Sequence, residues 1–284
     1  MVRLLNPELK RLPISLKPSD CEIILADALS VLKDYPEESF QCCVTSPPYW
    51  GLRDYGIPNQ IGAEDNLEEY LKNLTEIFNE VRRVIKSDGT LWLNIGDSYT
   101  SGNRTWRDPD KKDPARAMQY RLPTPDGLKS KDLIGVPWRL AFTLQENGWY
   151  LRSDIIWHKP NCQPESVKDR PTRCHEYVFL FTKSEKYYYD FESILEQDAN
   201  GGKRNRRTIW SINTEPFPGA HFATFPPALV EPCIIAGSRP GDRVLDPFFG
   251  SGTTGEVCIR LKRKFLGIEI NPEYAELAKE RLGW

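Results

Sequence analysis

Short apolar runs alternate along this chain with longer segments that have a helical repeat. Most of the runs are apolar at consecutive positions and end at Gly, Pro or Asp, which is typical of strands buried on both faces of a sheet. The pattern predicts seven strands, at residues 22–25, 41–45, 90–95, 151–157, 177–182, 243–245 and 265–270. Seven strands of this kind are enough for one large sheet.

The segments between the strands predict helices. In residues 66–86 the apolar positions step by three and by one, so that one side of the segment is apolar and the other polar. A final helix is expected after Asn271, a favourable N-cap residue that is followed by Pro272. Further helices are predicted at residues 132–147, 228–236 and 253–261. Because strands alternate with helices, we predict an α/β fold with a mainly parallel sheet and helices on both faces.

The composition fits one large domain over residues 1–284, with 39 % hydrophobic and 27 % charged residues. No run approaches the roughly 20 apolar residues of a membrane helix, and residues 1–20 lack the apolar centre of a secretion signal. The seven cysteines show neither disulfide-like nor zinc-like spacing, and Cys42 and Cys43 lie in an apolar strand. We therefore expect a cytoplasmic protein with no metal and no membrane partner.

Two segments depart from the strand and helix pattern and are predicted to be insertions in this domain. Residues 98–131 are rich in Pro, Asp, Lys, Arg and Gly, and residues 186–213 mix aromatic residues and glycines with a basic run. That basic run consists of Lys203, Arg204, Arg206 and Arg207. The net charge of −2 does not by itself indicate a nucleic-acid partner. A basic run is usually a solvated surface, so it points to nucleic acid only if another feature does.

A glycine-rich turn follows the predicted strand at 243–245 and opens the helix at 253–261. Gly250, Gly252 and Gly255 match the pattern G-x-G-x-x-G, in which the backbone approaches a ligand closely. Glu269, at the end of the next strand, is placed to accept hydrogen bonds from both hydroxyls of a ribose. Taken alone, these residues favour a dinucleotide.

The residue that begins this turn changes that interpretation. Asp246 would repel a pyrophosphate but would attract a cationic amino-acid group. S-adenosylmethionine carries a ribose and an ammonium group and has no phosphate, so it is the predicted cofactor. The alternative is a turn that needs its glycines only for a tight change of direction.

A second turn, Ser46-Pro47-Pro48-Tyr49, directly follows the predicted strand at 41–45. The two prolines stiffen the turn and have no N–H groups, so their carbonyls can point into a cleft as acceptors. An exocyclic amine is a weak nucleophile, and acceptors for its hydrogens would localise its lone pair and direct it at a methyl donor. Tyr49 could stack on a base that has been turned out of its duplex. The alternative is a rigid corner that ends a strand.

Together the two turns resemble the DNA amino-methyltransferases that modify N4 of cytosine or N6 of adenine. Their order, with the catalytic turn first and the cofactor turn last, is similar to the beta group of that family. The resemblance implies the Rossmann-like fold of S-adenosylmethionine-dependent methyltransferases, with seven strands and a circularly permuted order of motifs. It also implies that the target-recognition region lies within residues 186–213, and this gives the basic run a function.

The resemblance assigns roles to individual residues. The catalytic residues would be Ser46, Pro47, Pro48 and Tyr49. The cofactor-binding residues would be Asp27, Thr224, Asp246, Phe248, Gly250, Gly252, Thr253, Thr254, Glu269 and Asn271. The DNA-binding residues would be Trp50, Arg53, Lys203, Arg204, Arg206 and Arg207.

The target base depends on one position. Family members with Ser before Pro-Pro-Tyr mostly methylate N4 of cytosine, whereas those with Asp or Asn mostly methylate N6 of adenine. Ser46 therefore favours N4 of cytosine in double-stranded DNA, with N6 of adenine or an RNA substrate as the alternatives. A separately encoded restriction endonuclease is a further candidate partner, and the sequence is compatible with a monomer or a homodimer.

Overall fold

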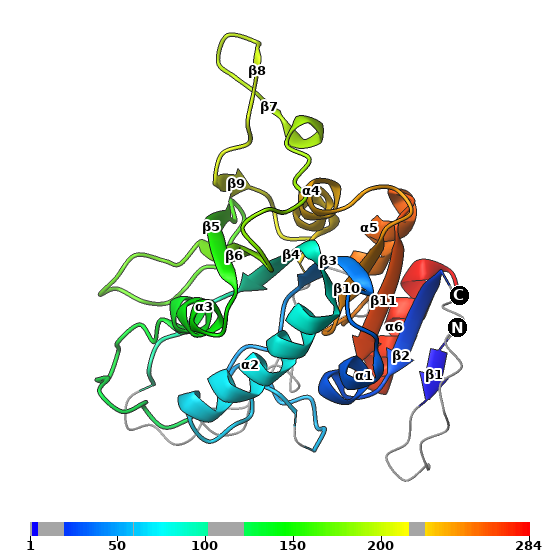
Figure 1. The fold of residues 1–284 in the computed structure, drawn as a ribbon. Helices are drawn as coiled ribbons and strands as arrows, with labels where there is room; N and C mark the ends of the chain where they lie inside the picture. The colour runs from blue at the N-terminus through cyan, green and yellow to red at the C-terminus, as the bar shows by residue number, and fades with distance from the viewer. Residues whose placement is uncertain (1, 5–19, 59, 102–121, 216–224) are drawn as a thin grey trace.

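The computed structural model describes residues 2–4, 20–58, 60–101, 122–215 and 225–284, and these form one mixed sheet between two layers of helices (Figure 1). The strands are β1 (Val2–Leu4), β2 (Cys21–Leu25), β3 (Phe40–Thr45), β4 (Ile85–Ile95), β5 (Tyr150–His158), β6 (His175–Thr182), β7 (Glu196–Gln197), β8 (Lys203–Arg204), β9 (Ile209–Ser211), β10 (Arg243–Asp246) and β11 (Lys264–Glu269). The helices are α1 (Ala28–Asp34), α2 (Leu67–Val84), α3 (Val136–Glu146), the short 3₁₀ helix η2 (Glu192–Ile194), α4 (Pro227–Gly237), α5 (Thr253–Arg260) and α6 (Pro272–Leu282).

The main sheet has nine strands in the order β1-β2-β11-β10-β3-β4-β6-β5-β9. All seven strands expected from the apolar runs are present in it. The two additional strands, β1 and β9, lie at its two edges and are three residues long each, too short to give an apolar pattern of their own. β6 is antiparallel to both of its neighbours, and the other neighbouring pairs are parallel. The predicted α/β fold with a mainly parallel sheet is thus confirmed.

The central strands are buried on both faces because alternate side chains enter two different cores. All six residues of β3 are buried, and Cys43 packs with the layer of α1, α2 and α3, whereas Cys42 packs with the layer of α4, α5 and α6. Both thiols are fully inaccessible. The adjacent cysteines are therefore core residues, as their place in an apolar run indicates.

The junction between α2 and β4 lies earlier than the sequence indicates. Helix α2 begins after Asn66, whose side chain accepts a hydrogen bond of 2.8 Å from the backbone N of Glu69. The helix ends at Val84 rather than at residue 86, because Ile85 is already extended and pairs with Phe40. β4 consequently has 11 residues, of which the predicted strand covers the second half.

The chain connections change direction between β10 and β3. From β10 the chain crosses through α5 to β11 on one side, and from β3 it crosses through α2 to β4 on the other. β3 and β10 are direct neighbours, with Val244 opposite Cys42 and Leu245 opposite Cys43. Open α/β sheets bind ligands at the carboxyl ends of the strands where such a reversal occurs. The turns after β3 and β10 both lie at this position, although about 200 residues separate them.

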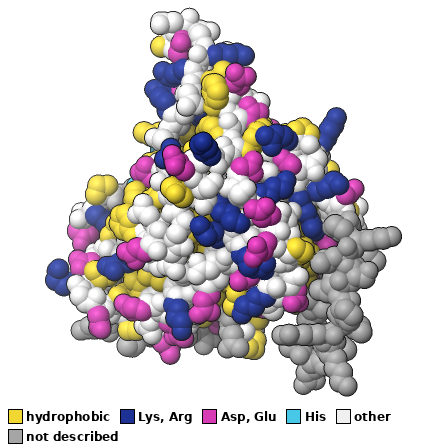
Figure 2. All heavy atoms as spheres, in the orientation of Figure 1, with side chains coloured by type: hydrophobic (Ala, Val, Ile, Leu, Met, Phe, Trp, Pro, Cys, Tyr) yellow, Lys and Arg dark blue, Asp and Glu magenta, His cyan; other side chains and the backbone are white. Residues whose placement is uncertain are grey.

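The second predicted insertion contains a β-hairpin. Strands β7 and β8 form it, and it projects from the body of the molecule beyond β9 and α4 (Figure 1). Figure 2 shows Lys and Arg side chains on this projection, together with Asp and Glu side chains. Most of the first predicted insertion, residues 102–121, lies outside the described residues. Among the helices that are described, none has the length and apolar character needed to span a membrane.

Candidate active site

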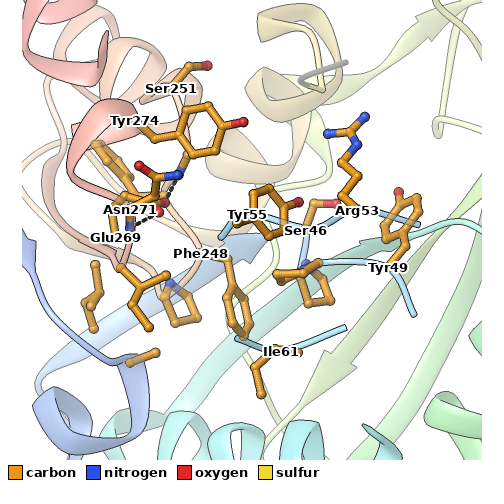
Figure 3. A pocket seen from close by; sticks show the side chains of 18 of the residues that line it. Ser46, Tyr49, Arg53, Tyr55, Ile61, Phe248, Ser251, Glu269, Asn271 and Tyr274 are labelled. Carbon is orange, nitrogen blue, oxygen red and sulfur yellow. Dashed lines mark hydrogen bonds between the residues drawn. The ribbon is translucent and has the colours of Figure 1, made fainter. Parts of the chain in front are cut away.

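One cavity opens at the carboxyl ends of β3 and β10, where the chain connections change direction. Both sequence motifs line it. In Figure 3, Ser46, Tyr49 and Arg53 lie toward one end of it, and Glu269 and Asn271 toward the other. Phe248 lies between these two groups. The predicted site residues that line the cavity are Asp27, Ser46, Pro47, Pro48, Tyr49, Arg53, Phe248, Gly250, Thr253, Glu269 and Asn271. The chain thus brings the expected catalytic turn and the expected cofactor turn to one cavity.

The Ser-Pro-Pro-Tyr turn is held by helix α2. The hydroxyl of Tyr70 donates a hydrogen bond of 2.8 Å to the backbone carbonyl of Pro48, and Tyr70 is fully buried. The Pro48 carbonyl is therefore engaged in the protein. One acceptor position of this carbonyl is thus occupied, and Ser46 and the Pro47 carbonyl become the main candidates for accepting the hydrogens of the amine.

Asp246 lies beneath the two turns instead of on the wall of the cavity. One carboxylate oxygen accepts hydrogen bonds from Thr45 Oγ1 (2.6 Å) and from the backbone N of Phe248 (3.1 Å), and the other accepts one from Thr254 Oγ1 (2.6 Å). Burial raises the pKa of Asp246 to about 6, although these hydrogen bonds work in the opposite direction. The carboxylate thus joins the turn after β10 to the end of β3, and its attraction for the ammonium group of a cofactor stays a prediction.

Gly252 and Thr254 have structural places in the same turn. Gly252 precedes α5 with φ of +82°, and a Cβ atom added there would lie 3.0 Å from the Cβ of Ala278. Thr254 is fully buried. Neither residue lines the cavity, so both have a structural place in the turn, and their direct contact with the cofactor stays a prediction.

Glu269 ends β11 and organises the far end of the cavity. Its carboxylate accepts hydrogen bonds of 2.7 Å from the backbone N of Gly250 and of 2.7 Å from the backbone N of Asn271. Asn271 in turn caps α6 by accepting a hydrogen bond of 2.8 Å from the backbone N of Glu273. Burial raises the pKa of Glu269 to about 7. Hydroxyl donors would stabilise the ionised form of this buried carboxylate, so Glu269 fits the ribose of the predicted cofactor.

The remaining predicted residues present four different cases. Asp27 caps α1, where it accepts a hydrogen bond of 2.9 Å from the backbone N of Ser30, and it also lines the cavity. Trp50 is buried and donates a hydrogen bond of 3.0 Å to the carbonyl of Glu64, so it supports the loop and does not line the cavity. Thr224 lies outside the described residues. The basic run lies on the β7–β8 hairpin and its exit, and none of its four residues lines the cavity.

Several lining residues were not identified from the sequence. Tyr55 and Tyr274 meet edge to face, with 6.0 Å between ring centroids, beside the Glu269 end of the cavity. The other end includes Asn94, Trp157, Lys159 and Glu176. A signal was available for three of these, because Asn94, Lys159 and Glu176 are polar residues at the ends of apolar strands. The predicted strands did not reveal that these ends converge, since that depends on the order of strands in the sheet.

Comparison with known proteins identifies the class. The family model described as DNA methylase, of the N6/N4 type, matches residues 40–280. The type II methyltransferase M.SmaI of Serratia marcescens is 67 % identical over 264 residues, which cover 92 % of this chain and 90 % of that protein. The type II methyltransferase M.Cfr9I of Citrobacter freundii is 65 % identical over 256 residues, which cover 90 % and 85 %.

Solved structures share the fold. The cytosine-N4-specific PvuII DNA methyltransferase superposes with a TM-score of 0.70 at 24 % identity, over 93 % of this chain and 86 % of that one. A protein described as a DNA modification methylase of Thermus thermophilus, solved with S-adenosyl-L-methionine, gives 0.64 at 27 % identity and covers 93 % of each chain.

This chain belongs to the N6/N4 DNA methylase family. It is an S-adenosylmethionine-dependent DNA methyltransferase that resembles type II enzymes, and double-stranded DNA is the substrate of that class. The order of its motifs, with Ser-Pro-Pro-Tyr before the glycine-rich turn, is that of the beta group. Within the described residues, no cluster of three or more His, Cys, Asp or Glu side chains could hold a metal ion.

The raised pKa of Glu269 gives cofactor binding an expected pH dependence. In the predicted ribose site the hydroxyls would donate to the ionised carboxylate, so affinity for S-adenosylmethionine should increase as the pH rises from about 6 to about 8. Glu269→Gln should weaken binding by ~1–3 kcal/mol at pH 8 and reduce this pH dependence. Titration calorimetry across this range checks both effects, and an unchanged affinity in the variant would remove Glu269 from the ribose site.

The raised pKa of Glu269 also makes the stability of the folded protein depend on pH, in the direction opposite to that of cofactor affinity. A carboxyl group whose pKa is raised from its ordinary value of 4.5 to about 7 favours the folded state in its neutral form. Its contribution to stability is therefore complete below pH of about 4.5 and is lost as the pH rises through about 7. Bound cofactor should offset that loss, which thermal unfolding with and without S-adenosylmethionine would measure.

Proposed function

We propose that this enzyme methylates the exocyclic N4 amine of cytosine at a specific site in double-stranded DNA. The observation that supports this proposal most strongly is the position of Ser46. It stands before Pro-Pro-Tyr at the end of β3, and it lines the same cavity as the cofactor turn. A neutral hydroxyl is sufficient there, because the amine loses its proton only as the methyl group arrives. Methylation of adenine N6 by the same chemistry is the alternative.

In this proposal the protein orients the two reactants and contributes no covalent nucleophile. S-adenosylmethionine supplies an electrophilic methyl group on its sulfonium. Ser46 and the Pro47 carbonyl accept the hydrogens of the amine and direct its lone pair, and Tyr49 forms a wall against the ring. Glu269 and the backbone of Gly250 hold the cofactor at the other end of the cavity.

The cysteines are consistent with methylation of an amine. Carbon-5 methylation of cytosine requires a thiolate nucleophile, and none of the seven cysteines lines the cavity. Cys233, in the only Pro-Cys pair, is buried in α4 and donates to the carbonyl of Leu229 at 3.3 Å. Burial raises the pKa of its thiol well above the ordinary value. Cys233 therefore belongs to the core.

The proposal extends to the organisation of the whole chain. Residues 1–284 would form one catalytic domain with insertions at 98–131 and 186–213, and the second insertion would be the target-recognition region. The projection of the β7–β8 hairpin and its basic residues support this assignment. The type II names of the relatives support a separately encoded restriction endonuclease as the biological partner.

Transfer of a tritiated methyl group tests the proposed substrate class. The enzyme is incubated with labelled S-adenosylmethionine and, in parallel, with unmethylated plasmid DNA, total RNA or free nucleosides. Incorporation that depends on DNA is expected. Incorporation only into RNA or nucleosides would contradict the proposal.

A further inference from the structure

A network of polar side chains forms the wall of the cavity behind Tyr49. Its members come from four places in the fold: Tyr49 after β3, Asn94 on β4, Glu176 on β6 and Lys159 after β5. β4, β6 and β5 are consecutive neighbours in the sheet, so the network spans three strands. All four residues line the cavity, and the roles assigned from sequence include only Tyr49.

Glu176 is the centre of this network. Its Oε2 accepts a hydrogen bond of 2.9 Å from the hydroxyl of Tyr49 and one of 3.3 Å from Nδ2 of Asn94. Asn94 is itself fixed, because its Nδ2 also donates to the carbonyl of Tyr177 at 3.0 Å. The other carboxylate oxygen, Oε1, forms an ion pair with Nζ of Lys159. Each oxygen of Glu176 therefore has at least one partner within the protein.

Lys159 is held over an aromatic ring as well as against the carboxylate. Its Nζ lies 4.1 Å from the centroid of the Trp157 ring, which is buried. The side chains of Lys159 and Glu176 are only 16 % and 19 % exposed. A carboxylate with so little solvent around it is costly unless a cation is beside it, and Lys159 is placed to balance its charge and to fix its position.

Close packing against Gly96 also restricts the Tyr49 ring. A Cβ atom added to Gly96 would lie 2.7 Å from Cε2 of Tyr49 and 3.2 Å from Cγ of Glu176. The Tyr49 ring and the Glu176 stem thus both lie against the backbone of a glycine. The hydroxyl is held by a hydrogen bond and the ring by van der Waals contact, which leaves the ring little freedom to turn.

We infer that Glu176, supported by Lys159, is a positioning residue that fixes the Tyr49 ring as a preformed wall of the base pocket. The inference depends on the proposed function, in which the extruded base lies against Tyr49. A wall fixed before the base arrives loses little conformational freedom when the base binds, so more of the stacking energy is retained in the productive complex. Glu176 acts through the Tyr49 hydroxyl and does not itself need to touch the base.

A double-mutant cycle on the full-length enzyme tests this coupling. Glu176→Gln removes the charge that holds Lys159 and weakens the acceptor for the phenol, and Tyr49→Phe removes only the hydroxyl. Each single variant is expected to lower kcat/KM for DNA methylation by about tenfold, with no more than a twofold change in the Kd for S-adenosylmethionine. The double variant should lose no more than the larger single loss, because both changes break the same link.

The matched control is Glu80→Gln. Glu80 pairs with Arg83 at 2.8 Å on α2, with side-chain exposures of 23 % and 27 %, and does not line the cavity. This variant should keep the wild-type kcat/KM. If Glu176→Gln does not fold, Lys159→Gln takes its place in the cycle with Tyr49→Phe, because it removes the other charge of the pair.

Two outcomes would overturn the inference. Losses that multiply in the double variant, to about a hundredfold, would show that Glu176 and the hydroxyl act independently. A Glu176→Gln enzyme with wild-type kcat/KM would show that the link has no effect on the reaction. Failure of the proposed function is a different result, because the wild-type enzyme would then place its methyl group on a position other than N4 of cytosine, whatever the double-mutant cycle shows.

Discussion

Replacing Ser46 with Ala is expected to lower kcat for DNA methylation by roughly 10²–10³, the usual effect of losing one preorganised polar group at a reacting centre. Ser46 lines the cavity at the end of β3, between the proposed base wall and the cofactor turn. Since Tyr70 already donates to the Pro48 carbonyl, Ser46 is a main candidate acceptor for the amine in this turn. The change should therefore affect the chemical step far more than it affects binding.

The measurements that distinguish rate from binding are single-turnover methyl transfer and titration calorimetry. Ser46→Ala should bind S-adenosylmethionine and DNA within about threefold of wild type, whereas Ser46→Thr keeps a hydroxyl and should keep more activity. Ser39→Ala is a suitable control, because Ser39 precedes the opposite end of β3 and does not line the cavity. A Ser46→Ala enzyme that loses stability but almost no rate would show that Ser46 only ends the strand.

The second large effect is expected in DNA binding. Lys203, Arg204, Arg206 and Arg207 lie on the β7–β8 hairpin and the segment that follows it. Each phosphate contact contributes about 0.9 to the slope of log affinity against log salt concentration. Replacing all four residues with Ala should make that slope shallower by about 2–3, while affinity for S-adenosylmethionine is preserved.

The arrangement of the hairpin explains why the expected change in the salt slope is smaller than four full phosphate contacts would give. Nε of Arg204 and Nε of Arg207 both donate to one oxygen of Glu196, at 2.9 and 2.7 Å. Arg206 lies over the Trp210 ring, with 4.5 Å between Cζ and the centroid. One carboxylate already balances part of the charge of two arginines, so their contribution to phosphate binding is reduced.

Fluorescence anisotropy of labelled duplex DNA at several salt concentrations gives the slope. The control variant carries four alanines at exposed cations on the body of the protein, Lys33, Lys72, Arg260 and Lys264. It should keep the wild-type slope. If the hairpin variant keeps it as well, the basic run is an ordinary solvated surface and the recognition region must be sought elsewhere.

The sequence was sufficient to predict the sheet and both turns for a local physical reason. Parallel strands buried on both faces are apolar at every position, and each turn follows such a strand directly. The pattern of apolar positions does not show which strands are neighbours in the sheet. Asp246 and Thr45 are hydrogen-bonded across 201 positions of sequence, and only the pairing of β10 with β3 shows that Asp246 joins the two turns.

The same limit explains which site residues were missed. Glu176 and Lys159 lie at facing ends of β6 and β5, where Trp157 is opposite Glu176 in the register. Their ion pair and the contact with Tyr49 depend on the order β3-β4-β6-β5, which no periodicity in the chain encodes. The edge strands β1 and β9 were missed for a different reason, because three residues cannot show a period of two.

The decisive measurement is the identity of the base that receives the methyl group. Unmethylated DNA is treated with the enzyme and with S-adenosylmethionine labelled in its methyl group, then digested to nucleosides and analysed by chromatography with mass spectrometry. We expect the label in N4-methyldeoxycytidine, which chromatography separates from its 5-methyl isomer. Label found only in N6-methyldeoxyadenosine, or in 5-methyldeoxycytidine, would contradict the assignment of Ser46 to the N4 amine of cytosine.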